Sequence, residues 1–195
     1  MQIDLDLLFT WGAIAKEYKK GEVIFNEKET ANFYYQIADG NVRMFNSNDE
    51  GKEFTQGNFS KGDSFGEPPL FISEKYPSTA IACQECRIIK LGKDKFLNIL
   101  EEYPAIQKQF LELICKRLHA KSKSTTAIIN QKPEYRIMAF LKANKKTECD
   151  KKEIVPFTRQ EIANFTGLRV ETVIRTFSKM RAQEKIDIVR HKIFY

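Results

Sequence analysis

Short apolar or β-branched runs recur between Ala15 and Leu91, and turn-forming residues separate them. The runs lie at residues 23–25, 33–37, 42–45, 80–82 and 88–91. Glycine, asparagine and aspartate gather between them, at residues 20–21, 39–41, 48–51, 56–58 and 61–63. Turn signals at this spacing predict short strands in a small antiparallel barrel or jelly-roll. A sheet of this kind can enclose a ligand or serve as a scaffold.

Helical periodicity replaces this pattern from Lys93, and a long helix is expected after Tyr103, because Pro104 suits a first helical turn. Its side chains form two stripes: Ile106, Phe110, Leu113, Arg117 and Ala120 in one, and Leu111, Ile114, Leu118, Thr125 and Ile129 in the other. A helix of about 25 residues with two such stripes has two surfaces to bury. We expect its own sheet on one side and the same helix of a second copy on the other. The alternative is a helix that packs only within its own chain.

A helix break at Gln131, Lys132 and Pro133 marks the natural boundary in the chain. We therefore expect an α+β protein with three parts. They are a jelly-roll, or double-stranded β-helix, over residues 1–102, a dimerisation helix over 103–131, and a third domain over 132–195.

The third part is expected to begin with a helix over residues 134–143, in which Tyr135, Met138 and Leu141 are the inward candidates. The polar segment that follows, residues 144–152, is expected to form a loop.

Residues 158–161, Thr-Arg-Gln-Glu, form a capping-box sequence, in which the threonine hydroxyl and the glutamate carboxylate bond to free amide groups at a helix start. This helix contains Ile162, the small Ala163 and Phe165, and we expect it to end at Gly167, since glycine takes the left-handed conformation of a sharp turn. A second helix begins at about Arg169 and buries Val173, Phe177 and Met180. This pattern predicts a helix-turn-helix, whose second helix lies in the DNA major groove.

The outward positions at the start of the second helix suit base edges. They are Val170, Glu171, Ile174 and Arg175. Arginine can donate to O6 and N7 of guanine, glutamate can accept from N4 of cytosine, and valine or isoleucine can contact a thymine methyl group.

The end of the chain, residues 185–195, alternates apolar and polar positions on either side of Arg190, His191 and Lys192. We expect a two-stranded wing with a basic tip near the phosphate backbone. The candidate DNA contacts are Thr158, Arg159, Arg169, Val170, Glu171, Ile174, Arg175, Arg190 and Lys192. A helical domain that never meets nucleic acid is the alternative.

The charge of the chain is concentrated in this third domain. Residues 131–195 contain 15 Lys and Arg against 8 Asp and Glu, whereas residues 1–130 contain 17 against 18. A basic domain joined to a nearly neutral one is typical of a protein that binds a polyanion such as double-stranded DNA. Two alternatives remain: a solvated basic surface, and a ligand-sensing module whose basic domain docks on an acidic protein. Steep salt dependence together with sequence preference would indicate DNA.

From residue 15 to 195 the chain resembles the Crp/Fnr family of bacterial transcription regulators. The segments that carry the resemblance are residues 33–40 (Phe-Tyr-Tyr-Gln-Ile-Ala-Asp-Gly), 62–67 (Gly-Asp-Ser-Phe-Gly-Glu) with Leu70 and Phe71, the helix after Pro104, and 158–161 with 167–175. The resemblance implies a cyclic-nucleotide-binding-type roll, a dimerising helix and a winged helix-turn-helix. It also implies a homodimer on a palindromic promoter site, with RNA polymerase as a further partner.

The same resemblance places Glu171 and Arg175 at base-reading positions, and Thr158 and Arg159 at phosphate-contacting ones. Val170 stands where the cyclic AMP receptor protein has arginine, so the reading helix is more similar to the Fnr branch. A half-site with a TGA-like core is the family expectation. Ile174 is larger than the residue usual in either branch, so the flanking bases stay open.

The family's phosphate-binding cassette is incomplete in this chain. Pro77 replaces the arginine that neutralises the cyclic phosphate, and the loss of such a charge-assisted pair costs on the order of 1.5–3 kcal/mol or more. Pro68 and Pro69 also remove two backbone donors. The remaining effector-pocket candidates are Gly66, Glu67, Ser78, Thr79, Lys121 and Ser122.

By the same resemblance, Glu67 can hold a ribose hydroxyl, and Lys121 stands at the family's threonine position on the long helix, where it would offer a cation from another direction. We nevertheless expect no binding of cyclic AMP at physiological concentrations and no cofactor. A dimer that needs no effector is possible.

The positions of cysteine and histidine in the sequence give little support to a redox, iron–sulfur or haem sensor. Cys83, Cys86, Cys115 and Cys149 are too few and too scattered for a disulfide framework, so we expect free thiols. Cys83 and Cys86 have redox-motif spacing without a second pair for zinc, and we expect buried structural thiols, with a redox switch as the alternative. The Fnr branch carries an N-terminal cysteine cluster for an iron–sulfur centre, which this chain lacks before Cys83. His119 is expected to be a solvated or packed histidine rather than a haem ligand.

Enzymatic activity is not expected. Cupin oxygenases share a small barrel but need several histidines inside it as metal ligands, and the two histidines here, His119 and His191, both follow the sheet region. Motifs for a P-loop, a nucleophile elbow or a His–Glu zinc pair are missing from the sequence, and we expect no metal site. No run approaches eighteen apolar residues, and the first residues are acidic, so we expect a cytoplasmic protein without a membrane partner.

Overall fold

The computed structural model describes residues 3–129, 132–145, 152–190 and 192–195, with the side chains of residues 123–129 excepted. The chain divides into two compact units, Met1–Arg117 and Leu118–Tyr195. The division falls inside the long helix α4 (Pro104–Ile129), so this helix contributes to both units.

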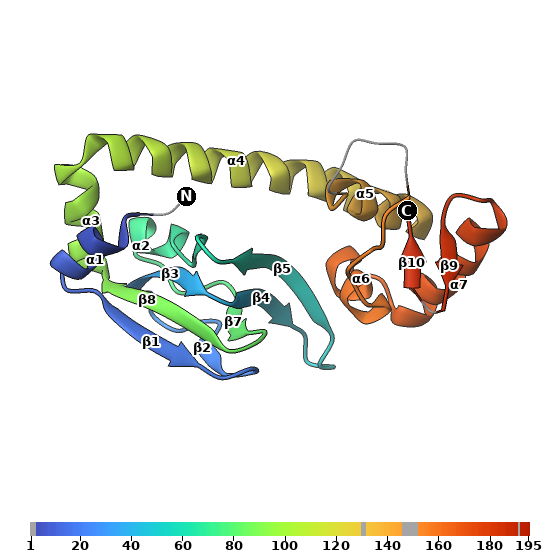
Figure 1. Cartoon of the computed structure of the whole chain (residues 1–195), viewed down its shortest axis with the longest axis horizontal. Coiled ribbons are helices and arrows are strands. Elements are labelled where there is room, and N and C mark those ends of the chain that lie inside the picture. The colour runs from blue at the N-terminus through green and yellow to red at the C-terminus, as the bar shows by residue number, and fades with distance from the viewer. Residues whose placement is uncertain (1–2, 130–131, 146–151, 191) are drawn as a thin grey trace. The chain divides into compact units, whose positions relative to one another are not determined.

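The first unit is a roll of two four-stranded antiparallel sheets (Figure 1). One sheet has the order β1 (Ile14–Tyr18), β8 (Cys86–Gly92), β3 (Phe33–Asp39) and β6 (Ser64–Phe65). The other has the order β2 (Val23–Phe25), β7 (Thr79–Ala82), β4 (Asn41–Ser47) and β5 (Glu53–Ser60). The five runs expected from the sequence all lie in these strands, and the jelly-roll prediction is confirmed.

The expected turn at residues 56–58 is wrong, because these residues lie inside β5. Gly57 pairs with Met44, and the register between β4 and β5 shifts directly after that pair, as in a β-bulge. A Cβ at Gly57 would come 3.1 Å from the Phe59 ring. Glycine here therefore marks an irregular strand and a close approach, which look like a turn in the sequence.

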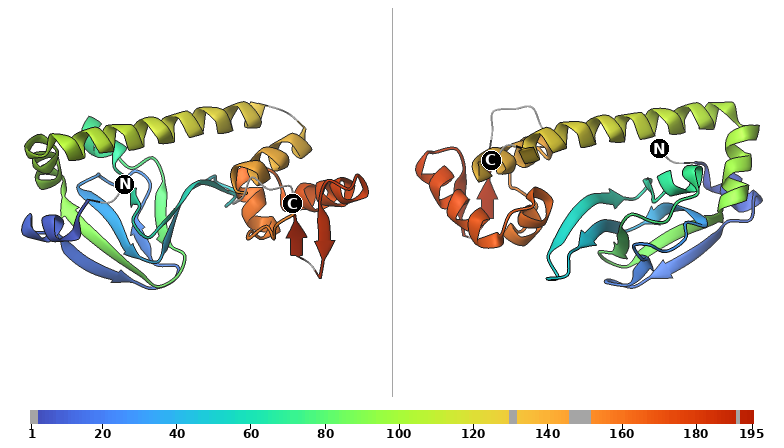
Figure 2. Two further views of the ribbon diagram at one scale, coloured as in Figure 1. Left: turned by 45° about the horizontal axis from the view of Figure 1, so that its top comes forward. Right: turned by 180° about the vertical axis from the view of Figure 1, so that it is seen from behind.

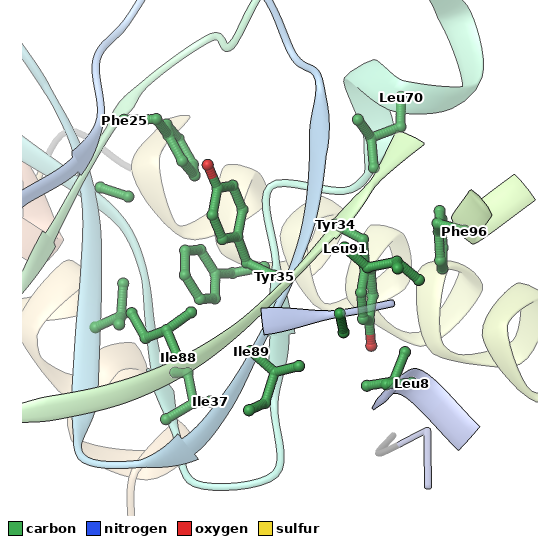
Figure 3. Close-up of a cluster of buried hydrophobic side chains, with 14 of the residues drawn as sticks. Leu8, Phe25, Tyr34, Tyr35, Ile37, Leu70, Ile88, Ile89, Leu91 and Phe96 are labelled. Carbon is green, nitrogen blue, oxygen red and sulfur yellow. The ribbon is translucent and has the colours of Figure 1, made fainter. Parts of the chain in front are cut away.

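The roll core is rich in aromatic and aliphatic side chains, many of which Figure 3 shows. Three short helices close onto it: α1 (Leu5–Thr10) buries Leu8, α2 (Pro68–Ile72) buries Leu70, and α3 (Lys93–Glu102) buries Phe96. Phe96 stacks on Tyr34 of β3 with ring centroids 4.4 Å apart. Trp11, the single tryptophan, packs against this core.

The N-terminal segment is joined to β3 by a buried amide. The Gln36 side chain, 0% exposed, accepts from the Ile3 backbone N at 2.9 Å and donates to the Ile3 backbone O at 2.8 Å. The Tyr34 hydroxyl donates to the same Gln36 oxygen at 2.7 Å. Gln36 thus pairs with Ile3 much as a neighbouring strand would.

Helix α4 places most of one predicted stripe on the roll, whereas Ala120 of that stripe is exposed. Phe110 is buried there, and Ile106 and Leu113 are half-buried against the same core. Leu111 and Leu118 of the other stripe are 64% and 69% exposed. Ile114, expected in that second stripe, instead packs partly on the roll. The side chains of Thr125 and Ile129 lie outside the described residues.

Besides the end of α4, the described part of the second unit contains three helices and a small sheet (Figure 2). They are α5 (Pro133–Ala143), α6 (Arg159–Thr166) and α7 (Val170–Ala182), with β9 (Asp187–Val189) paired to β10 (Lys192–Phe194). Ile154 adds an isolated bridge to Phe194. Their core combines Ile137, Leu141, Ile162, Ala163, Val173, Phe177, Met180, Ile186 and Ile193.

The inward positions of α5 differ from the expected ones. Tyr135 is 57% exposed, and the buried residues of the helix are Ile137 and Leu141, with Met138 partly buried. Tyr135 was therefore assigned to the wrong face. Residues 146–151 of the expected loop lie outside the described residues. In the part of the chain that the structure describes, no helix is both long and apolar enough to span a membrane.

Candidate nucleic-acid interface

The capping box at the start of α6 forms as the sequence predicts. The Thr158 Oγ1 accepts from the Glu161 backbone N at 3.2 Å, and the Glu161 Oε2 accepts from the Thr158 backbone N at 2.7 Å. At the other end of the helix, Gly167 adopts the left-handed conformation, with φ 67°. The capping box thus determines where α6 begins, and the left-handed glycine determines where the chain turns towards α7.

Helix α7 presents opposite faces to the core and to the surface. Val173, Phe177 and Met180 are buried, as predicted, together with Thr176. Arg169 is the N-cap residue and is exposed, as are Glu171, Ile174 and Arg175 in the first two turns. Val170 departs from the expected outward position, because it is half-buried and packs in part against the domain core.

Glu171 and Arg175 stand one helical turn apart on the exposed side of α7. Among the described residues, neither charged group has a hydrogen-bond or ion-pair partner. A carboxylate and a guanidinium that are exposed and unpaired can bind an external ligand without first breaking an internal contact. Arg159, the first residue of α6, is half-buried, and the Thr158 hydroxyl donates to Glu161 at 2.8 Å.

The predicted wing is present as the β9–β10 hairpin. Val189 pairs with Lys192, and Arg190 in the turn between them has φ 46°. Arg190 and Lys192 are exposed, whereas His191 lies outside the described residues. A Lys152–Asp187 ion pair with an Nζ–Oδ2 distance of 2.8 Å links the wing to the chain before α6.

In the roll, Glu67 has a partner that sequence reasoning missed. Its side chain is 1% exposed, and Arg117 of α4 donates through Nη1 to both carboxylate oxygens at 3.0 and 3.1 Å. Arg117 Nη2 donates to the Ser64 backbone O at 2.7 Å, and the guanidinium lies 5.2 Å from the Phe59 ring centre. An arginine within an otherwise apolar stripe of α4 was the available signal, since an arginine on an inward helix face is expected to pair with an acid.

The other side of the expected pocket carries acceptors instead of the missing arginine. Asn46 Nδ2 donates to the Glu27 carboxylate at 3.0 Å and also to the Pro77 carbonyl. The Thr79 Oγ1 accepts from the Glu27 backbone N at 3.0 Å, and Ser78 is buried. The Glu27 carboxylate therefore shares a donor with the carbonyl of Pro77, the residue that replaces the arginine expected from the family resemblance.

The remaining pocket candidates are Gly66 in the roll, and Lys121 and Ser122 on α4. Gly66 has φ 74°, and a Cβ there would come 2.9 Å from the Phe25 ring. Lys121 and Ser122 are exposed on the part of α4 that belongs to the second unit.

Cys86 and Cys115 are free thiols, as expected, and Cys83 takes part in no disulfide among the described residues. The Cys86 thiol is buried and donates to the Asn41 carbonyl at 3.2 Å, which suits a structural role. Cys83 is exposed, so the expectation that both thiols of this pair are buried is wrong. Cys149 lies outside the described residues. His119 is exposed, and no cluster of three potential metal ligands occurs in the described ranges.

Two family models match the chain in succession. The cyclic nucleotide-binding domain covers residues 15–103, and the Crp-like helix-turn-helix domain covers residues 135–194. The first match coincides with the roll and the second with α5, α6, α7 and the wing.

Named transcription regulators align with most of this chain. The nitrogen fixation regulation protein FixK of Bradyrhizobium diazoefficiens is 24% identical over 177 residues, 88% of this chain and 73% of that protein. The transcriptional activatory protein AadR of Rhodopseudomonas palustris is 26% identical over the same shares. The c-di-GMP-responsive global regulator CLP of Xanthomonas campestris has a similar fold, with a TM-score of 0.82 over 97% of this chain and 96% of that one, at 18% identity.

These matches follow the order of the parts along the chain: a nucleotide-binding-type roll, a long helix, and a helix-turn-helix with an exposed glutamate and an exposed arginine on its second helix. The alternative of a cupin-like enzyme finds no support in them. The chain belongs to the Crp/Fnr family of DNA-binding transcription regulators.

Proposed function

We propose that this regulator binds, as a homodimer, a palindromic promoter site, and that it does so without cyclic AMP. We propose the domain organisation that the sequence predicts, with a roll over residues 1–102, a dimerisation helix over 103–131 and a DNA-binding domain over 132–195. The observation that carries the proposal is the exposure of Glu171 and Arg175 at the start of α7, where neither has a partner among the described residues.

The proposed DNA contacts fall into two classes. Base edges are read by Val170, Glu171, Ile174 and Arg175, while phosphates are contacted by Thr158, Arg159, Arg169, Arg190 and Lys192. Guanine offers Arg175 two acceptors, and this bidentate contact is worth roughly 1–3 kcal/mol of discrimination between bases. The phosphate contacts supply affinity that falls with salt.

Dimer formation is supported by the exposed part of α4. Leu111 and Leu118 are seven residues apart and largely exposed, which fits the seam of two paired helices. Light scattering of the purified protein should give twice the chain mass. The double variant Leu111→Glu and Leu118→Glu should give the mass of one chain, because two pairs of like charges would meet in the seam. A monomeric wild type would refute the homodimer. RNA polymerase is the further partner we propose at the promoter.

Independence from cyclic AMP is supported by the groups in the roll. Arg117 already occupies the Glu67 carboxylate, and the Glu27 carboxylate shares a donor with the carbonyl of Pro77, which replaces the expected arginine. Calorimetric titration of the wild type with cyclic AMP should therefore show no saturable heat. Micromolar binding would refute this part of the proposal.

DNA recognition is tested by selection from a random duplex library without any added effector. We expect a palindrome with a G·C pair in each half-site. Arg175→Ala should weaken binding to that palindrome by about 1–3 kcal/mol per half-site and relax the base preference at the G·C pair. Ser178→Ala, one exposed position further along α7, is the matched control.

Selection of no palindrome would speak against an effector-free regulator, and repeating it with a panel of small molecules would show whether an effector is missing. Binding that ignores DNA sequence, together with capture of an acidic protein, would favour the rival function of a basic docking module. Unchanged affinity of Arg175→Ala for the selected site would refute the assignment of α7 as the reading helix.

A further inference from the structure

Ile174 is an aliphatic side chain that its own domain does not bury. It is 47% exposed, although it lies on α7 between residues that pack into the core. Phe177 and Val173 fill the inward face without it. Val170, one turn earlier, is different, since part of its side chain packs against that core.

The neighbours of Ile174 on the exposed side of α7 are polar. Arg175 follows it directly, Glu171 precedes it by three residues, and Ser178 stands one turn beyond. A β-branched residue is a weaker helix former than alanine, lysine or glutamate, so an exposed isoleucine here does not serve the helix itself. Its exposed methyl groups suit an apolar group of a ligand.

The DNA major groove offers such a group at one base only, because thymine alone carries a C5-methyl. Adjacent residues of a helix are 1.5 Å apart along its axis, and successive bases of a strand are about 3.4 Å apart. A base touched by Ile174 therefore lies within about two base pairs of the base that Arg175 reads.

We propose that Ile174 selects a thymine in each half-site by packing against its 5-methyl group, within two base pairs of the guanine bound by Arg175. The proposal rests on the proposed function. It assigns the thymine contact mainly to Ile174, because Val170 is half-buried and offers less of its side chain to a base.

Replacing one thymine at a time by uracil tests this, because uracil pairs with adenine but lacks the methyl group. The selected palindrome is synthesised with uracil at each thymine within two base pairs of the G·C pair, in both half-sites. At one position we expect affinity to fall by about fourfold per half-site, the effect of losing one buried methyl group. The other positions should change affinity by less than twofold.

The variant Ile174→Ala identifies the side chain responsible. It should bind the thymine duplex more weakly than wild type does and should bind the thymine and uracil duplexes equally well. Ser178→Ala, the matched control on the same exposed face, should retain the full uracil effect. Circular dichroism should give wild-type helix content for both variants.

Two results would overturn the inference while leaving the proposed function intact. One is a palindrome whose affinity is insensitive to uracil at every tested position. The other is a uracil effect that persists unchanged in Ile174→Ala. If wild type selects no palindrome at all, the proposed function fails, and this inference fails with it.

Discussion

The ion pair between Arg117 and Glu67 is the contact in the roll whose removal should cost most. Glu67 is 1% exposed, and among the described residues Arg117 is the partner of its carboxylate. Arg117→Met would leave that charge buried without a counter-ion, which typically costs about 3–5 kcal/mol. Because the Arg117 side chain is 30% exposed, the ion pair borders solvent, and we expect the lower end, about 3 kcal/mol.

Urea unfolding followed by the fluorescence of Trp11 measures this loss, since the single tryptophan packs against the roll core. Lys116→Met, which removes an exposed charge from the neighbouring position of α4, should change the unfolding free energy by less than about 0.5 kcal/mol.

A second variant separates the effect of the unpaired charge on stability from the effect of changed side-chain packing. Glu67→Met combined with Arg117→Met removes both charges and keeps the side-chain volumes similar, and such replacements are often neutral. The Glu67 side chain makes no capping bond to α2, so none is lost. The double variant should be more stable than Arg117→Met alone. The reasoning would be refuted by a loss below 1 kcal/mol in Arg117→Met, or by a double variant at least as unstable as the single one.

Three further results are expected. Phe177→Ala should destabilise the DNA-binding domain by about 3–5 kcal/mol in urea unfolding followed by circular dichroism, because Phe177 is 1% exposed; the exposed Ser178→Ala should not. Burial raises the pKa of Tyr76 to about 12, so the stability that Tyr76 contributes is complete below the ordinary tyrosine pKa and is lost as the pH rises towards 12. Urea unfolding followed by Trp11 fluorescence should therefore show that Tyr76→Phe loses less unfolding free energy at alkaline pH than wild type does. The hydrogen bond from Lys185 lowers the pKa of Glu134, so the stability that Glu134 contributes is present above the ordinary glutamate pKa and is lost as the pH falls through the lowered pKa. In urea titrations, the unfolding free energy of Glu134→Gln should therefore depend less on acid pH than that of wild type.

The helix-turn-helix could be predicted from the sequence because its signals are local. The capping bonds join Thr158 to a residue three positions away, and Gly167 determines the turn through its own backbone conformation. The buried face of α7 then follows from helical spacing. Each of these features depends on a few consecutive residues, so the rest of the fold does not need to be known.

The predictions that were wrong concern residues whose pairing or burial depends on contacts with distant parts of the sequence. Gly57 has the same local signature in a turn and in a bulge, and only its pairing with Met44 separates the two. Tyr135 and Ile137 both fit a helical stripe, and it is the packing of α5 against α6 and α7 that buries Ile137. Arg117 and Glu67 are fifty residues apart in the sequence, so no spacing rule could pair them.

The pairing of Gln36 with Ile3 bears on where an independently folding fragment of the roll can start. The family model begins at residue 15, but a fragment cut there would lack the backbone groups that satisfy a fully buried amide. The Gln36 oxygen would keep the Tyr34 hydroxyl, whereas its NH2 group would lose the Ile3 carbonyl, at a cost of roughly 1–3 kcal/mol. The loss of Leu8 from the core would add to this. A fragment of the roll expressed alone should therefore start no later than Ile3, twelve positions before the start of the matched domain at residue 15.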